Sequence, residues 1–106
     1  MSTVTINNKK YPVPELTFRH LPMMEKSGLS IVDMMSKKYI FTAVEVFTAI
    51  VVGCETDYAD HLLEQHILGG GDVTEIYDAF ITAMYESSFF SKMLEDEKDQ
   101  KTPANK

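Results

Sequence analysis

The side chains best suited to metal or acid–base chemistry lie in one segment, at Asp57, His61 and Glu64. On a helix, spacings of four and three residues place them on one face, where a carboxylate and an imidazole could share a zinc ion. His61 and His66 lie about 140° apart around a helix, so they cannot chelate one ion, and no histidine pair has the four-residue spacing of zinc peptidases. We therefore interpret this face as solvated, and we predict no metal site and no cofactor.

Two further features match catalytic signatures only in part. Cys54 is the single cysteine of the chain and lacks the surrounding motif of a cysteine nucleophile, so we interpret it as a small apolar residue at a helix end. The run Gly69-Gly70-Gly71 is followed by Asp72, whose carboxylate repels an anion, and not by the lysine of a phosphate-binding loop. We interpret the glycines as a flexible linker between two helices, and we predict that the protein is not an enzyme.

The composition narrows the environment and the partners. The 106 residues fit one domain, and a single cysteine excludes an intrachain disulfide, which suits a reducing compartment. The net charge of −6 disfavours nucleic acid and anionic lipid as partners, because phosphates repel an acidic surface. The longest apolar stretch, 39–52, has 14 residues and includes Glu45, whereas spanning a bilayer takes about 20. Since the sequence begins without a signal-peptide pattern, we expect a cytoplasmic protein that does not bind membranes.

The N-terminal segment predicts a hairpin followed by an irregular helix. Alternating apolar residues over 3–13 surround Asn7-Asn8, a pair that accepts the positive φ angles of a tight turn. Pro14 suits the first turn of a helix over 15–26, and Pro22 breaks or kinks that helix.

The middle of the chain predicts a short helix and an ambiguous apolar segment. Ser30 and Asp33 form a capping-box pair at the start of the short helix, whose inward residues are Ile31, Met34 and Met35. The valine-rich segment 39–52 favours a strand by propensity. A helix is indicated instead by one narrow polar stripe, made of Thr42, Glu45 and Thr48.

Two amphipathic helices are predicted after this segment. Thr56 or Asp57 caps the first, over 57–68, and its inward residues are Ala59, Leu62, Leu63, His66 and Ile67. Asp72 caps the second, over 73–86. Its inward residues are Val73, Ile76, Tyr77, Phe80 and Met84, the clearest helical period in the sequence.

We predict a mainly α fold: a small helical domain over 1–94 with a short N-terminal β-hairpin, and an α+β fold as the alternative. Residues 95–106 have almost no apolar side chains, which predicts a disordered charged tail. Methionine pairs suit adaptable binding surfaces but also fill cores, and Phe89-Phe90 is either a closing core contact or a docking patch. The candidate contact residues are Phe89, Phe90, Met93, Met23, Met24, Met34 and Met35.

A series of apolar periods and turns is typical of one protein family. Late in the chain it comprises Leu62-Leu63-Glu64, His66-Ile67, Gly69-Gly70-Gly71, Asp72-Val73-Thr74-Glu75-Ile76, Ala79-Phe80, Ala83-Met84 and Ser87-Ser88-Phe89-Phe90. Earlier it comprises Thr5-Ile6-Asn7-Asn8-Lys9-Lys10-Tyr11, Met24-Glu25, Gly28-Leu29 and Phe41-Thr42-Ala43-Val44. With this series, nearly all of residues 4–94 resembles the tail assembly chaperones of long-tailed bacteriophages and prophages. Pro22 and the valine-rich 44–52 depart from the family pattern.

The resemblance implies a non-enzymatic assembly factor. Such proteins bind the tape-measure protein, with the tail-tube protein as a second partner, in the host bacterial cytoplasm, and they are absent from the mature virion. Self-association is compatible with this role. The alternative is a structural tail component or another protein-interaction module, and a structural component remains in purified particles.

The interpretation of His61 as a solvated residue predicts that His61→Ala leaves the protein nearly unchanged. A surface substitution of this kind shifts the free energy of unfolding by no more than about 0.5 kcal/mol. Urea denaturation measures that shift, and metal analysis of protein purified without added metal is expected to find none. Stoichiometric zinc that disappears in the variant would contradict the interpretation.

Overall fold

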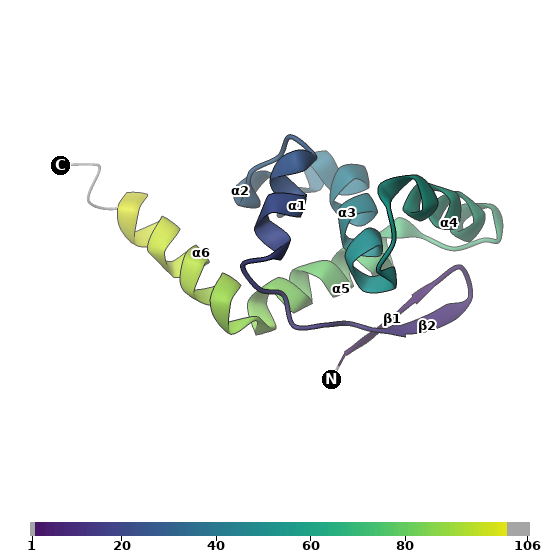
Figure 1. The fold of residues 1–106 in the computed structure, drawn as a ribbon, viewed down its shortest axis with the longest axis horizontal. Helices are drawn as coiled ribbons and strands as arrows, with labels where there is room; N and C mark the ends of the chain where they lie inside the picture. The colour runs from purple at the N-terminus through teal and green to yellow at the C-terminus, as the bar shows by residue number, and fades with distance from the viewer. Residues whose placement is uncertain (1, 102–106) are drawn as a thin grey trace.

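Six α-helices, one short 3-10 helix and a two-stranded antiparallel hairpin make up the computed structural model, which describes the backbone of residues 2–101 and the side chains of residues 2–95. In chain order the elements are β1 (Thr3–Ile6), β2 (Lys9–Pro12), α1 (His20–Lys26), α2 (Ile31–Met34), the 3-10 helix η1 (Lys37–Tyr39), α3 (Ile40–Val52), α4 (Thr56–Leu68), α5 (Val73–Glu86) and α6 (Ser88–Lys101). In Figure 1 the hairpin lies beside α4 and α5, and α6 extends away from the other helices. This arrangement confirms the predicted mainly α fold with an N-terminal hairpin.

The hairpin turns at Asn7-Asn8, as predicted. The two residues have φ angles of 52° and 68°, which a tight two-residue turn requires and asparagine tolerates. The register pairs Val4 with Tyr11 and Ile6 with Lys9. Val4 and Ile6 are buried, because alternate residues of a strand point to one face, and β1 places that face against α4 and α5.

The segment before α1 is irregular, so the predicted helix over 15–26 with Pro14 in its first turn is wrong in its first part. The Ser87 hydroxyl donates to the Leu16 carbonyl oxygen at 2.5 Å, and the Leu16 side chain is fully buried. This anchoring keeps the Leu16 backbone out of a helix. The later start also places Pro22 in the first turn of α1, where a missing backbone N–H leaves no helical bond unmade.

α3 is the central helix of the fold, and the ambiguous segment 39–52 is helical from Ile40 onward. Gly53 ends it with a φ of 78°, as is usual for glycine at a helix end. Its buried residues are Ala43, Val44, Val46, Phe47, Thr48 and Ala49. Thr48 therefore lies in the core and not on the predicted polar stripe, and its hydroxyl has no hydrogen-bond partner among the described residues.

No single helix in the described part of the chain is both long and apolar enough to cross a bilayer. The segments Lys37–Val52 and Thr56–Leu68 pass that test only as a pair, with a bend of 108° between them. α3 belongs to this pair, and most of its apolar side chains pack in the core of the domain or against it.

α4 buries most of the predicted inward face, namely Ala59, Leu62, Leu63 and His66. Ile67 was also predicted inward but is 49% exposed, because it lines an open groove with Phe41 of α3. The helix begins after Glu55 and not after Thr56 or Asp57, and the Glu55 side chain makes no capping bond.

α5 forms the predicted core stripe. Its buried residues are Ile76, Tyr77, Phe80, Ala83 and Met84. Val73, predicted on the same stripe, is only partly buried at the start of the helix. Asp72 caps α5 as predicted, because its carboxylate accepts the Thr74 N–H at 2.9 Å. The ring centroids of Phe80 and Phe47 lie 5.3 Å apart, so an aromatic contact joins α5 to α3 in the core.

His66 joins the hairpin turn to the loop between α4 and α5. Its Nδ1 accepts the Asn7 N–H at 2.9 Å, which leaves Nε2 as the donor toward the Asp72 carbonyl oxygen at 3.3 Å. A Cβ atom at Gly71 would collide with the His66 ring, so glycine is required there by packing. Gly70 has a φ of 99°, and the N–H groups of Gly70 and Gly71 bond to α4 carbonyls, so the glycines form a bonded turn and not the predicted flexible linker.

α6 carries the chain away from the domain. Its first turn is held by the fully buried Phe90, and its backbone remains helical through Lys101. The predicted disordered tail over 95–106 therefore differs from the structure over 95–101, and residues 102–106 lie outside the described residues.

The packing of Phe80 predicts a large loss of stability when its ring is removed. Phe80→Ala is expected to lower the free energy of unfolding by about 3–5 kcal/mol, because a buried cavity replaces the ring between α5 and α3. The matched control is Phe41→Ala, since that phenylalanine is 70% exposed and its loss should cost no more than about 0.5 kcal/mol. Urea denaturation of both variants makes the comparison, and equal losses would contradict this assignment of the core.

Candidate protein-binding groove

The predicted contact residues divide into core and surface positions. Phe90, Met24 and Met34 are fully buried members of the hydrophobic core. Their placement on a contact surface is therefore wrong for this fold, because a partner cannot reach them. The partly buried positions are Phe89, Met93 and Met35, and Met23 is 38% exposed.

Phe89-Phe90 closes the core and is not an open docking patch. The Phe90 N–H donates to the Ser87 hydroxyl oxygen at 3.1 Å, which fixes the start of α6. The Phe89 ring meets the rings of Phe90 and Phe18 edge-on, with centroids 5.0 and 5.9 Å apart. Of these three rings only that of Phe18 is mostly exposed.

An open groove of about 680 Å³ runs between α2, α5 and α6, and we call it the α2/α5/α6 groove. Its apolar lining residues are Val32, Met35, Tyr77, Ile81, Tyr85 and Leu94. Tyr77, Ile81 and Tyr85 are four residues apart, so they form one stripe along α5 beside the core stripe. Val32 is 47% exposed and Tyr85 62% exposed, which leaves apolar surface open to a partner.

The groove contains or borders residues of both regions that the sequence analysis proposed as contact surfaces. Met35 comes from the second methionine pair, and Leu94 follows Met93 on α6. The sequence reasoning missed Val32, Ile81 and Tyr85. The four-residue spacing of Tyr77, Ile81 and Tyr85 was the available signal, but it lies next to the stronger core stripe of the same helix.

Tyr77 lines the groove and carries a buried hydroxyl. The side chain is 3% exposed, and its hydroxyl has no hydrogen-bond partner among the described residues. Burial, with a smaller effect of the nearby Asp78 carboxylate, raises the pKa of Tyr77, so the hydroxyl keeps its proton. A buried donor without an acceptor is uncommon, and it is a group that a bound partner could satisfy after a small movement of the groove wall.

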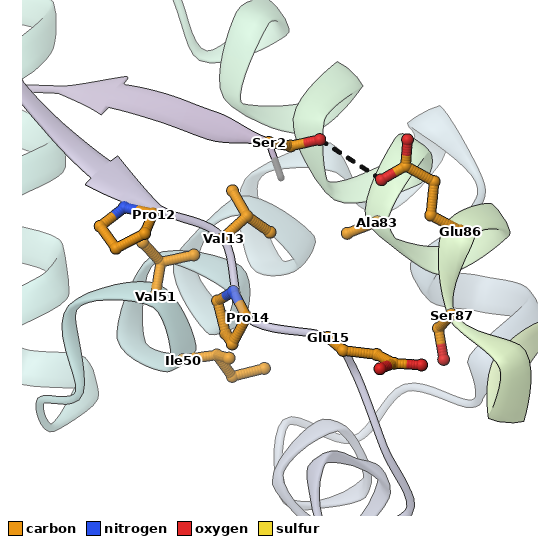
Figure 2. A pocket seen from close by; sticks show the side chains of 10 residues that line it. All are labelled: Ser2, Pro12, Val13, Pro14, Glu15, Ile50, Val51, Ala83, Glu86 and Ser87. Carbon is orange, nitrogen blue, oxygen red and sulfur yellow. Dashed lines mark hydrogen bonds between the residues drawn. The ribbon is translucent and has the colours of Figure 1, made fainter.

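A second cavity, of about 590 Å³, lies between the hairpin, the end of α3 and the end of α5 (Figure 2). Its walls include Pro12, Pro14, Ile50 and Val51. The polar groups at its edge already have partners: Glu86 accepts from the Ser2 hydroxyl at 3.3 Å, and Glu15 accepts from the Ser88 N–H at 3.4 Å. Ser87, also at the edge, donates to a backbone carbonyl and not to a general base, so its hydroxyl is not activated as a nucleophile.

The remaining candidates for chemistry do not form a site. Asp57, His61 and Glu64 are exposed on α4, and no group of three or more potential metal ligands comes together within the described residues. Burial, followed by the charge of Glu55, raises the pKa of Cys54, which keeps this thiol protonated and poorly nucleophilic.

Glu45 and Asp60 form a carboxyl pair between α3 and α4 that the sequence reasoning did not predict. A side-chain hydrogen bond with Asp60, then burial, then the charges of Asp60 and Asp57, raise the pKa of Glu45 from 4.5 to about 7. A carboxyl and a carboxylate can share one proton, but two carboxylates repel each other. The signal in the sequence was a lone glutamate within an otherwise apolar segment.

Comparison of the chain with protein families, with characterised proteins and with solved structures gives no match.

The Glu45–Asp60 pair predicts a loss of stability as pH rises. The pKa of Glu45 is higher in the folded than in the unfolded chain, so folding takes up a proton between about pH 4.5 and 7 and stability falls as pH rises through this window. Asp60→Asn removes the repulsion and is expected to be more stable than the natural chain at pH 8 by about 1 kcal/mol, with little difference at pH 5, where the pair is protonated. Urea denaturation at both pH values measures the difference.

One control variant isolates this effect, and one other titrating group contributes to the pH dependence of every variant. Glu64→Gln makes the same change in charge on an exposed position of α4 and should leave the pH dependence unchanged. Burial, with a smaller effect of the Arg19 charge, lowers the pKa of His20, which destabilises the fold as pH falls below 6.5 and acts equally in every variant. A natural chain and an Asp60→Asn variant with parallel stability curves would contradict the pairing.

Proposed function

We propose that this protein is a non-enzymatic tail assembly chaperone of a long-tailed phage or prophage, and that the α2/α5/α6 groove binds the tape-measure protein. The observation that carries the proposal is the open apolar groove with exposed Val32 and Tyr85, which has the shape and chemistry to receive an apolar partner segment. The resemblance of residues 4–94 to tail assembly chaperones supports the choice of partner.

The physical need for such a chaperone follows from the partner. A tape-measure protein is long and exposes apolar helix stripes before the tail tube encloses it, and such stripes aggregate unless they are covered. An amphipathic helix binds in a groove through apolar residues spaced by three and four. Met35 and Leu94 line the groove with flexible side chains that adjust to different apolar segments.

Release is as necessary as binding in this role. The groove is open and only partly apolar, since Lys37 and Asp78 also line it, which suits moderate affinity. The net charge of −6 keeps loaded complexes apart by repulsion. We place this activity in the host bacterial cytoplasm, with the tail-tube protein as a second partner and with no copy of the chain in the mature virion.

Co-expression with the tape-measure protein of the same phage tests the function and the surface together. The natural chain should raise the soluble fraction of the tape-measure protein, and Val32→Ser/Tyr85→Ser should not, because two exposed apolar contacts are lost from the groove. Each such contact contributes up to about 2 kcal/mol, roughly thirtyfold in Kd. The matched control is Tyr58→Ser/Leu68→Ser, which removes two exposed apolar side chains from α4.

The outcomes separate the two parts of the proposal. If the natural chain and the groove variant raise the soluble fraction of the tape-measure protein equally, the chaperone function is supported and the assignment of binding to this groove is wrong. A tape-measure protein that is equally soluble with and without this chain rules out the chaperone. Stoichiometric recovery of the chain from purified particles indicates a structural tail component instead.

A further inference from the structure

A second groove lies on another face of the molecule, between α3 and α4, and we call it the α3/α4 groove. It has a volume of about 260 Å³, and its walls include Phe41 and Val44 of α3 and Leu63 and Ile67 of α4. These residues are spaced by three and four along their helices, so two apolar stripes face each other across it. Phe41 is 70% exposed and Ile67 is 49% exposed, so both present apolar surface to solvent.

The polar part of the α3/α4 groove is the carboxyl pair of Glu45 and Asp60. Glu45 lies one helical turn after Phe41, on the same side of α3. The charges that act on Glu45 most strongly are those of Asp60 and Asp57 on α4, and both are negative.

On its other side, Glu45 borders a separate cavity. The titratable groups that line that cavity are Lys26 of α1 and Cys54 and Glu55 before α4. Lys26 is not among the groups that shift the pKa of Glu45, and the charges that do shift it are both negative.

We propose that the α3/α4 groove is a docking site for a segment of a partner protein that presents an arginine or lysine beside an apolar side chain. This site is separate from the α2/α5/α6 groove and does not depend on the proposed chaperone function. Three features of the groove match the cationic and the apolar side chain of such a segment. The carboxyl pair attracts the cation, the face of the exposed Phe41 ring receives it by a cation–π contact, and Ile67 with Leu63 receives the apolar side chain.

Charge complementarity decides in favour of a cationic partner. A guanidinium or ammonium group between two carboxylates takes the place of the shared proton, and the proton is released to solvent. An acidic segment would add a like charge to the pair, and a purely apolar segment would bury it without compensation. Binding should therefore strengthen with pH, because the pKa of Glu45, raised to about 7, leaves its carboxyl mostly ionised at pH 8 and mostly protonated at pH 5.5.

Titration of the full chain with two tripeptides, observed by ¹⁵N–¹H NMR, tests the site. The probes are acetyl-Leu-Arg-Leu-amide and acetyl-Leu-Gln-Leu-amide, which differ only in the cation. We expect chemical-shift changes that concentrate on Phe41, Glu45, Asp60 and Ile67. The arginine peptide should bind roughly tenfold more tightly than the glutamine peptide at pH 8, and this preference should be smaller at pH 5.5. The ¹³C carboxyl signal of Glu45 should titrate at lower pH in the complex than in the free chain.

Matched variants separate the site from the general acidity of the chain. Asp60→Asn should abolish the preference for arginine, whereas Glu25→Gln, with the same change in net charge on α1, should retain it. Phe41→Ser should weaken both peptides, and Tyr58→Ser, which removes another exposed ring, should not.

Four outcomes would overturn the assignment. The first two are equal binding of the two peptides and chemical-shift changes that centre outside the groove. The third is an equal loss of the arginine preference in Glu25→Gln and Asp60→Asn. The fourth is a chemical-shift change of the groove residues when the chain associates with itself in the absence of peptide. The last outcome would assign the groove to a second copy of this chain.

Discussion

The burial of α3 is the constraint on which the rest of the structure depends. An apolar helix with six buried residues can exist in water only if other elements cover it, and α1, α2, α4, α5 and β2 all contact it. The contact of Phe47 with Phe80 joins it to α5, the helix that also contacts the hairpin and α6. Each neighbour therefore uses one apolar face to cover α3, and whatever apolar surface remains on it faces outward.

That remaining surface explains where the grooves lie. α5 carries a core stripe through Ile76, Phe80 and Met84, and a second stripe one residue further along through Tyr77, Ile81 and Tyr85. The first stripe packs in the core with α3, while the second forms the floor and wall of the α2/α5/α6 groove. α4 has a similar arrangement. Leu63 is buried, whereas Ile67, one turn later, is 49% exposed and lines the α3/α4 groove. The core and the groove walls thus use adjacent stripes of the same helices.

Local patterns were enough to predict the elements but not their mutual placement. The Asn7-Asn8 turn, the Asp72 cap and the Ile76–Phe80–Met84 stripe depend on neighbours in sequence, and these predictions are confirmed. The errors depend on contacts between distant residues. The Ser87 hydroxyl holds Leu16 across 71 positions and prevents a helix there, and His66 reaches 59 positions back to Asn7. Likewise, sequence periodicity cannot distinguish a methionine that faces α3 from one that faces a groove.

Three features that folding alone does not explain lie at the grooves. The Glu45–Asp60 pair places two carboxyls together and raises the pKa of Glu45, Phe41 exposes most of its ring, and Tyr77 buries a hydroxyl without a partner among the described residues. A chain selected only for stability would lose such features easily, because single substitutions remove each of them. Thr48 is the counterexample, since its hydroxyl lies in the core without a partner among the described residues and lines neither groove, and we have no functional reason for it. The other three line the two grooves, and for this reason we base both proposals on the grooves and not on the histidines or the cysteine.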